Sequence, residues 1–299
     1  MAAGKLKRIR GESFPNNYTA KEMNMSIFTI DQKKCKRDGM CAKECPSQII
    51  VLADKDTFPT LLENGEESCI NCGHCVAVCP HGAFTLNTMP LAECPSIQKN
   101  LIPDAGQIKQ LLKARRSIRF YKDRVVDHDL LEELIDTARY APTGSNKQQV
   151  QWTVFENPTE VNCLAAMVID WARLMIPLMP DESMVKKMER RITAWDKGTD
   201  SILRGAPHLI AVHSQSDLPF AEADCVIALS YLELYAYAKG LGTCWAGYLT
   251  AAANYHEPLA QALGLLKGHK CFGAMMLGYP QYKYSRIPKR NAPVVAWHP

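Results

Sequence analysis

The sequence predicts an α+β protein built from two domains. Its 299 residues exceed the usual length of one domain, about 100 to 200 residues, and 47% of them are hydrophobic, enough for a packed core. After residue 105, apolar stretches with helical and with strand periodicity alternate without a regular βαβ rhythm. This pattern favours α+β over a doubly wound parallel sheet.

Charge and hydropathy place few limits on the partners. Thirty-five Lys and Arg against 31 Asp and Glu leave a formal charge of +4, too small to indicate nucleic acid. We expect no membrane span, because the best candidate, residues 225–242, is interrupted by Glu233 and Lys239. Residues 1–24 are expected to be an N-terminal extension that begins basic but lacks an apolar secretory core. We therefore expect a cytoplasmic protein with reduced thiols.

Seven of the twelve cysteines lie within residues 35–79. Read back from Cys79-Pro80, the chain carries C-x2-C-x2-C-x3-C-P without a defect. Read back from Cys45-Pro46, the same pattern recurs with Asp38 where a cysteine is expected. Zinc also binds CxxC pairs, and disulfides use paired cysteines. Two repeated C-x3-C-P endings favour iron–sulfur clusters over both.

These motifs make the segment from Met25 to Leu86 resemble bacterial two-cluster ferredoxins, and we expect a domain at residues 25–88. In such proteins the last cysteine of each run ligates the other cluster. The resemblance implies two sites, which we name the cluster A site and the cluster B site. Cluster B would be a [4Fe-4S] cluster on Cys69, Cys72, Cys75 and Cys45, and cluster A a [4Fe-4S] or [3Fe-4S] cluster on Cys35, Asp38, Cys41 and Cys79.

Asp38 decides what the cluster A site holds. Carboxylate oxygen is a harder and more labile iron ligand than thiolate, so one iron could be exchangeable. The alternative is that Asp38 is a surface acid in a turn beside Gly39 and that cluster A has three protein ligands. Cys94 also precedes a proline but has no CxxC partner, and we expect it to be a linker thiol.

Residues 89–105 are expected to link this domain to a second one at 106–299, because prolines interrupt the segment. Asp104 can cap a helix that ends near Arg116. A second helix should begin at Asp127 or Asp129 and end before Pro142. The remaining expected elements are strands at 150–155, 209–212 and 271–277 and a mostly apolar helix at 221–239 closed by Gly240 and Gly242.

Several residues have competing interpretations. The Met and Trp residues of segment 167–199 could line a mobile lid or pack in the core. Cys244 could be redox-active, but a small apolar filler is favoured. The residues expected to be structural are Cys163, Cys225, Cys271, His208 and His213.

Four patches in the second domain carry candidate chemistry. Each has an ordinary explanation by itself, as a solvated charge run or as turn chemistry. In chain order they are Arg115-Arg116-Ser117-Ile118-Arg119, the loop Ala141–Gln148, the small-residue run Gly240–Gly247, and Leu277–Pro280 with the downstream pair Lys289 and Arg290.

Together and in this order, the patches RRSxR, APTGSNxQ, GLGTCWxG and LGYP resemble the nitroreductase family, over about residues 108–299. The resemblance implies a homodimer of α+β fold that holds FMN at its interface. It also implies roles by position. Arg115, Ser117, Lys289 and Arg290 would bind the phosphate with Arg116 nearby, and Arg119 would face the pyrimidine edge and support the reduced flavin. Pro142, Thr143, Ser145 and Asn146, with Gln148 as a further candidate, would reach the FMN across the dimer. Ala246 and Gly247 would present backbone groups near its N5, and Trp245 is a further cofactor-binding candidate.

One departure concerns the family's Gln-Pro-Trp, where this chain has Gln148-Gln149-Val150-Gln151-Trp152. The course of the chain into the strand is therefore open.

The two halves together indicate an iron–sulfur flavoprotein oxidoreductase. Clusters carry single electrons, whereas flavin can also deliver a hydride from N5, its reactive centre. A ferredoxin or another low-potential donor would supply electrons to a small organic acceptor, such as a nitro-aromatic, quinone, enone or flavin. The alternatives are a relay to a protein partner and a redox sensor. No nucleic-acid or membrane partner is expected.

Overall fold

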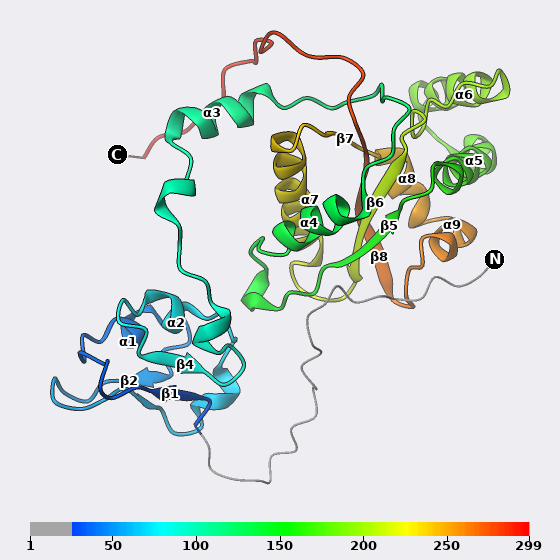
Figure 1. Ribbon diagram of the computed structural model, residues 1–299. Helices are drawn as coiled ribbons and strands as arrows, with labels where there is room; N and C mark the ends of the chain where they lie inside the picture. Colours follow the sequence, from blue (N-terminus) through cyan, green and yellow to red (C-terminus); the bar gives the residue numbers. More distant parts are fainter. Residues whose placement is uncertain (1–25, 299) are drawn as a thin grey trace. The chain divides into compact units, whose positions relative to one another are not determined.

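The computed structural model describes residues 26–298 and contains two compact units (Figure 1). The small unit extends to Ile102, and the large unit comprises Pro103–Gly144 and the chain from Gln148 onward. The expected N-terminal extension, residues 1–24, lies outside the described residues.

The small unit is built from two copies of one motif, 34 residues apart. Its helices α1 (Met40–Glu44) and α2 (His74–Val78) each follow a glycine in the left-handed region, with φ of 71° at Gly39 and 70° at Gly73. Each helix ends at a cysteine with extended backbone. Because a proline follows that cysteine, the helix cannot continue and the chain turns away.

Two short antiparallel pairs complete the small unit. Strand β1 (Phe28–Ile30) pairs with β4 (Phe84–Leu86), and β2 (Ile50–Val51) pairs with β3 (Thr60–Leu61), which a short 3-10 helix, η1 (Gly65–Ser68), follows. The buried core is small and includes two of the motif cysteines, Cys41 and Cys75. A unit with so small a core usually needs a metal or disulfide for stability.

Most of the expected linker, up to Ile102, belongs to the small unit. Short 3-10 helices follow β4 at η2 (Leu91–Glu93) and η3 (Lys99–Leu101). Met89, Leu91 and Cys94 pack partly buried against the small core. Cys94 is thus held at the edge of this unit, and its Sγ donates to the carbonyl oxygen of Pro90 over 3.5 Å.

The large unit is a four-stranded antiparallel sheet with helices on both faces (Figure 1), which confirms the α+β prediction. The strands, in spatial order, are β5 (Gln151–Phe155), β6 (His208–Gln215), β8 (His269–Gly278) and β7 (Gly242–Trp245). One face packs on α4 (His128–Ala138) and α7 (Ala221–Ala238), and the other on α5 (Pro158–Met175), α8 (Gly247–Ala253) and α9 (Glu257–Ala262).

The remaining helices lie outside these layers. α3 (Ala105–Ala114) begins at the predicted cap, where Asp104 and Gln107 form a reciprocal capping box. α5 continues through a 3-10 turn, η5 (Ile176–Leu178), to α6 (Glu182–Asp196), and a short turn, η4 (Gly144–Asn146), precedes β5.

Three expectations need correction or completion. Cys163 was expected in the core and is exposed on α5; the helix buries the residues beside it instead. The run Gly242–Trp245 is an edge strand, β7, which its small residues did not predict. In segment 167–199, Trp171 and Met188 are buried in the core, so core packing explains much of its apolar pattern.

Within residues 26–298, one helical stretch, Pro158–Leu178, is long and apolar enough to cross a membrane, with a hydropathy of 1.5. The expected best candidate had been residues 225–242. Leu164, Val168 and Ile169 of this stretch are buried against the sheet. We interpret it as a core helix of the folded unit.

A histidine pair lies at the bulged end of β6, where His213 is buried and His269 is half-buried. The Nδ1 atoms of His213 and His269 are 3.0 Å apart, and Thr153 Oγ1 lies 3.4 Å from His213 Nε2. Burial, together with the neighbouring His269, lowers the pKa of His213 from 6.5 to about 4. The structural role predicted for His213 agrees with this position.

The His213 pKa predicts acid sensitivity of the large unit. The unfolded chain binds a proton at His213 below pH 6.5, but the folded chain does so only near pH 4, so stability falls as the pH drops through this window. We expect this pH change to cost about 3 kcal/mol more in the unaltered protein than in His213→Gln. Urea unfolding of both proteins at the two ends of the window measures the difference. Equal pH dependence of the two proteins would contradict the assignment.

Candidate metal and cofactor sites

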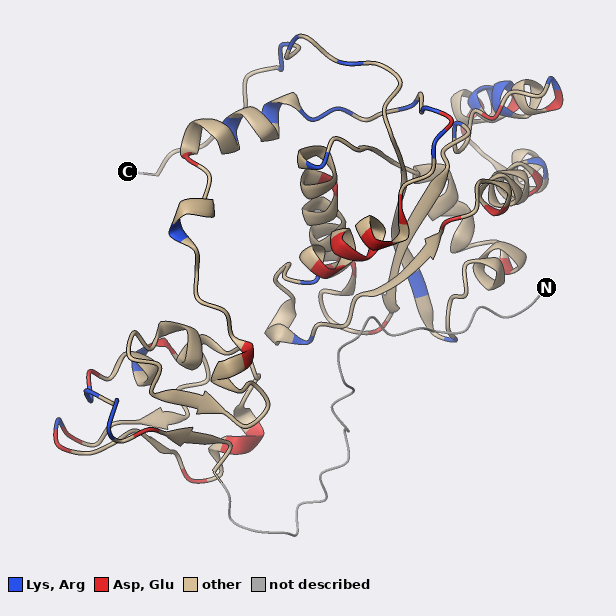
Figure 2. Ribbon diagram, viewed as in Figure 1, with Lys and Arg blue, Asp and Glu red and all other residues tan. Residues whose placement is uncertain are grey.

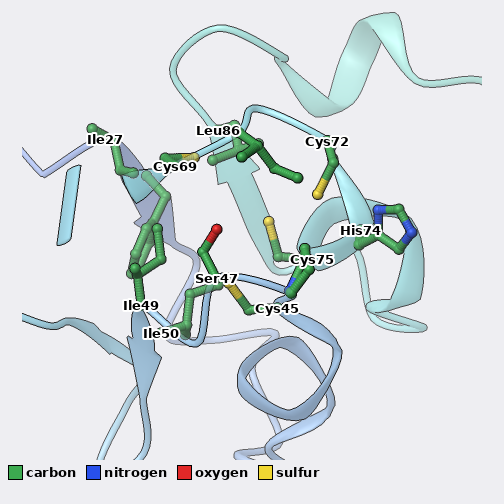
Figure 3. Close-up of a pocket in the computed structure, with 14 residues that line it drawn as sticks. Ile27, Cys45, Ser47, Ile49, Ile50, Cys69, Cys72, His74, Cys75 and Leu86 are labelled. Atoms are coloured by element: carbon green, nitrogen blue, oxygen red, sulfur yellow. The ribbon is translucent and has the colours of Figure 1, made fainter. Parts of the chain in front are cut away.

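The predicted cluster B ligands line one cavity of the small unit. Cys69, Cys72 and Cys75 come from the second motif and Cys45 from the first. Figure 3 shows the sulfur atoms of Cys72 and Cys75 on the side that faces Cys45, while the ring of His74 points away from them. Apolar side chains, among them Ile49 and Leu86, complete the wall. The structure thus brings together the four thiols of the predicted set.

The predicted cluster A ligands line a second cavity. Cys35, Asp38 and Cys41 come from the first motif and Cys79 from the second. The two cavities contain similar amounts of empty space, about 370 Å³ at the cluster B site and about 340 Å³ at the cluster A site, counting the part that is open to solvent. The cluster A cavity, which has Asp38 in place of a cysteine, is therefore comparable in size to the cluster B cavity.

The donor arrangement distinguishes a cluster from a single zinc ion. Within residues 26–298, no three His, Cys, Asp or Glu side chains lie close enough to hold one metal ion. A zinc ion would hold each sulfur at about 2.3 Å, which gathers the thiols tightly. Four thiols spread around a cavity fit the corners of a larger iron–sulfide core instead.

Two of the predicted cluster ligands have thiols buried in apolar surroundings, Cys41 at the cluster A site and Cys75 at the cluster B site. Burial raises the pKa of the Cys41 thiol to about 11 and that of the Cys75 thiol to about 12. Both are therefore protonated at neutral pH when no metal is bound. Because iron binds the thiolate, cluster assembly must release these protons.

We expect cluster assembly to be strongly favoured by raising the pH. Between about pH 6.5 and about pH 8.5, iron–sulfur reconstitution of the metal-free protein should become faster and more complete, with proton release. Cluster absorbance and a pH-indicator dye follow the two quantities. Assembly without proton release would show that these thiols are not ligands.

Asp38 lies on the cavity wall and also shapes the turn before α1. Its Oδ1 accepts a hydrogen bond from the backbone N–H of Met40 over 3.1 Å. Its Oδ2 lies 3.7 Å from Nε2 of His81, which lines the same cavity. The structure thus combines features of both predicted alternatives, a turn residue and a cavity residue.

In the large unit, three of the four predicted patches meet at one sheet edge. Ser117 forms a parallel bridge with Thr243 of β7, and the N–H of Ile118 donates to the Thr243 carbonyl over 2.8 Å. The N–H of Lys122 donates to the Tyr279 carbonyl over 2.8 Å. A Cβ at position 242 would lie 2.5 Å from Ile118, so this approach needs the glycine. The RRSxR segment therefore lies beside β7, and the chain directly after it reaches the LGYP segment.

This segment is strongly basic and incompletely paired. Figure 2 shows Lys and Arg along the chain between α3 and α4, whereas the charged residues coloured on α4 are Asp and Glu. The buried Nε of Arg116 has no hydrogen-bond partner, and Arg119 is exposed. Neither forms an ion pair with another described residue. Nη1 of Arg116 donates to the Arg115 carbonyl over 2.8 Å, so the unsatisfied donor is its Nε. A guanidinium with a free donor beside the Ser117 hydroxyl fits a phosphate group.

Arg115 has a partner that the sequence analysis missed. Its Nη1 donates to Oε1 of Glu233 on α7 over 2.9 Å, and Thr243 Oγ1 donates to the same oxygen over 3.3 Å. Glu233 is 7% exposed. An acidic residue inside the apolar 221–239 run was the available signal. This carboxylate fixes the guanidinium of a predicted phosphate ligand.

The loop before β5 is anchored to α7. Asp224 accepts hydrogen bonds from the N–H of Gly144 over 3.0 Å and from Nε2 of Gln149 over 3.2 Å. Ser145, Asn146 and Gln148 all have left-handed backbone, with φ of 51°, 54° and 49°, which is costly for residues with a Cβ. Pro142 is exposed, and Thr143 Oγ1 accepts from the Gln148 N–H over 3.0 Å. The side chain of Gln149 thus ties the entry to β5 to the start of α7.

The residues around β7 differ in how freely they could contact a bound cofactor. Burial raises the pKa of the Cys244 thiol, which agrees with a neutral filler. Trp245 packs against Gly273, with its Cζ3 2.9 Å from where a Cβ would stand. The N–H of Ala246 is already bonded to the Ala274 carbonyl over 2.8 Å, whereas space beside Gly247 is open. Gly247 is thus the more available backbone contact.

Lys289 and Arg290 lie on the exposed chain after β8, outside regular secondary structure. Within the described residues, no hydrogen bond or ion pair joins either one to Arg115 or Ser117. Their predicted part in phosphate binding stays a prediction.

Comparison with known proteins assigns both units. Residues 112–279 match the nitroreductase family, and residues 33–84 match the 4Fe-4S dicluster domain. A protein of Archaeoglobus fulgidus assigned as an NADH dehydrogenase/NAD(P)H nitroreductase is 25% identical over 177 residues, which cover 58% of this chain and 84% of that protein.

Solved structures share the fold of the large unit. A Bacteroides fragilis nitroreductase with bound FMN has a TM-score of 0.52 and 23% identity, covering 64% of this chain and 99% of that one. A Desulfitobacterium hafniense nitroreductase with bound FMN also has a TM-score of 0.52, with 20% identity, covering 66% of this chain and 100% of that one.

Proposed function

Because the chain belongs to the nitroreductase family and carries a 4Fe-4S dicluster domain, we propose that it is an FMN-dependent, iron–sulfur oxidoreductase. It takes electrons from a low-potential donor such as a ferredoxin and reduces a small organic acceptor. The acceptor class comprises nitro-aromatics, quinones, enones and flavins. We place this activity in the cytoplasm.

The single observation that carries the proposal is the meeting of three patches around a basic segment in which Arg116 and Arg119 have no ion-pair partner among the described residues. Ser117 and the orphaned Nε of Arg116 provide donors for a phosphate. Arg115, held by Glu233, adds a fixed positive charge. When bound, FMN supplies both one-electron and hydride chemistry at its ring.

The chain's residues would prepare the ring for this chemistry. The exposed guanidinium of Arg119 is free of any ion pair with another described residue, and we assign it to the pyrimidine edge. There its positive charge stabilises negative charge on the reduced ring. The open space at Gly247 admits a flat group close to the backbone. No side chain is assigned as a general acid or base.

A homodimer is part of the proposal, and the placement of the patches supports it. The loop anchored by Asp224 leads into β5, and the other three patches lie beside β7. These strands are opposite edges of the sheet, about 14 Å apart at the usual spacing. Asp224 and Glu233 are also nine residues apart on α7, about 14 Å along a helix axis. One flavin that uses both groups is best placed between two copies.

The two cofactor types suit conversion between electron counts. Iron–sulfur clusters pass single electrons, and a hydride acceptor needs two. The thiols that line the two cavities of the small unit would hold the one-electron stores, and the large unit would hold the flavin.

The proposal is tested first by measuring the cofactor content of the protein and then by measuring its enzymatic turnover. Protein purified without oxygen should contain about one FMN and about eight irons per chain, given two four-iron clusters. It should then reduce a nitro-aromatic or quinone with reduced ferredoxin as donor. Zinc without sulfide would contradict the cluster assignment, and a fully loaded protein without small-molecule turnover would favour a relay or a sensor.

A further inference from the structure

The two cavities of the small unit differ in the donors at one corner. The two motifs repeat after 34 residues, so Asp38 at the cluster A cavity corresponds to Cys72 at the cluster B cavity. In the same way, His81 at the cluster A cavity corresponds to Ser47 at the cluster B cavity. Both changes fall on the cluster A cavity. The repeat thus replaces one sulfur donor with an oxygen and a nitrogen donor.

The backbone conformation of the two motifs makes these positions comparable. Arg37 and Asn71 have φ of 57° and 51°. Gly39 and Gly73 have φ of 71° and 70°. In both motifs the residue after the C-x3-C-P proline lies on the wall of the cavity. The difference between the two corners is therefore one of side chains and not of chain course.

The distance between the two new donors suits a shared metal ion. His81 Nε2 and Asp38 Oδ2 are 3.7 Å apart, which is longer than a hydrogen bond of 2.7–3.2 Å. On an ion that already has three sulfide ligands, two further ligands about 2.1 Å away stand roughly at a right angle and about 3.0 Å apart, so a closure of about 0.7 Å would bring both donors onto one ion. Asp38 Oδ1 is already bonded to the Met40 N–H, so Oδ2 is the free oxygen. Both side chains are partly exposed, 38% for His81 and 33% for Asp38.

We propose that His81 Nε2 and Asp38 Oδ2 together ligate the metal ion at this corner of cluster A. The proposal rests on the iron–sulfur assignment above. A nitrogen and oxygen corner binds divalent ions such as Fe²⁺ or Co²⁺ reversibly, in contrast to the thiolate corners. Binding of one M²⁺ to a reduced three-iron core of zero charge gives a four-metal core of charge 2+, with no electron transferred. Dithionite supplies the electron that first reduces the three-iron core.

The first test looks for the nitrogen directly. Protein labelled with ¹⁵N-histidine is reduced, and pulsed electron spin resonance measures the coupling of nitrogen to the clusters. A histidine coupling should be present in the unaltered protein and lost in His81→Ala. His74→Ala is the matched control, because His74 lines the cluster B cavity with its ring turned away from the sulfurs (Figure 3). No histidine coupling in the unaltered protein, or its loss only in His74→Ala, would overturn the proposal.

The second test measures the corner ion. After oxidative removal of one iron and reduction with dithionite, Co²⁺ or Fe²⁺ is titrated against the three-iron signal. His81→Ala should weaken binding at least about tenfold, since even outer partners of metal ligands contribute 10–100-fold. Ser47→Ala, the equivalent position at cluster B, should leave it unchanged. Equal affinity in His81→Ala and the unaltered protein would overturn the proposal.

Further measurements distinguish loss of the fold, failure of the two-cluster assignment and failure of the role proposed for His81. The cluster B signal reports whether His81→Ala has kept the fold, which we expect because the side chain is 38% exposed. Absence of every iron–sulfur signal in the unaltered protein would contradict the two-cluster assignment itself. A complete cluster A signal without histidine coupling would contradict only the role of His81.

Discussion

Replacing both Cys72 and Cys75 by serine should lower ferredoxin-driven reduction of the acceptor by more than about 100-fold. Loss of an outer partner alone costs 10–100-fold in metal affinity or activity, and this variant removes two of the four thiols that line the cluster B cavity. Iron content should fall from about eight to about four per chain. Iron analysis and steady-state turnover measure the two effects.

Two controls accompany this variant, substitution of a cysteine outside both cavities and measurement of the FMN that the double variant retains. Cys94→Ser changes a cysteine of the same unit that lines neither cavity, so it should keep both iron and turnover. FMN content and chemical reduction of the flavin by dithionite should persist in the double variant, because the large unit is unaltered. Unchanged ferredoxin-driven turnover after loss of the cluster would mean that electrons do not pass through it.

The second large effect concerns the buried pair of Arg115 and Glu233. Glu233→Leu should lower the free energy of unfolding by about 3–5 kcal/mol, because it leaves a largely buried guanidinium without its partner. Glu233→Gln, which keeps an acceptor oxygen, should lose less. Glu222→Gln, an exposed site on the same helix, serves as the control and should stay within about 0.5 kcal/mol. Denaturant unfolding of the three variants measures these differences.

The same pair makes a specific prediction for flavin binding. If Glu233 positions the Arg115 guanidinium to bind the phosphate, Glu233→Leu should weaken binding of FMN at least about tenfold, which corresponds to about 1.4 kcal/mol of binding free energy. Binding of riboflavin, which has no phosphate, should change little. In Arg115→Leu the additional Glu233→Leu change should then have little further effect on FMN. Equal losses for FMN and riboflavin would assign Glu233 a purely structural role.

Much of the fold could be predicted because local signals and burial agree. Asp104 caps α3 as expected, and α4 follows Asp127 with Leu131, Leu134 and Ile135 on its buried face. These signals act within a few residues of the element they determine. The spacing of the cysteines likewise anticipated which thiols share each cavity, because the proline after each run turns the chain.

The remaining features depend on contacts distant in sequence. Strand β7 pairs with β8, and Gly242 admits Ile118 at close range on its other side; no local propensity reports either contact. The pairing of Arg115 with Glu233 spans 118 positions. Cys163 lies in an apolar stretch, but the register of α5 turns it to solvent. Ala246 was a candidate flavin contact, and only the ladder to Ala274 reveals that its N–H is taken.

The most direct test of the account is an anaerobic single-turnover reduction of the fully loaded protein by a low-potential one-electron donor. Cluster and flavin absorbance are followed together at several protein concentrations. Transfer within one molecule predicts that the clusters bleach first and that the flavin follows at a rate independent of protein concentration. A flavin rate proportional to protein concentration, or one unchanged in the Cys72 and Cys75 variant, would contradict the proposed route from cluster to flavin.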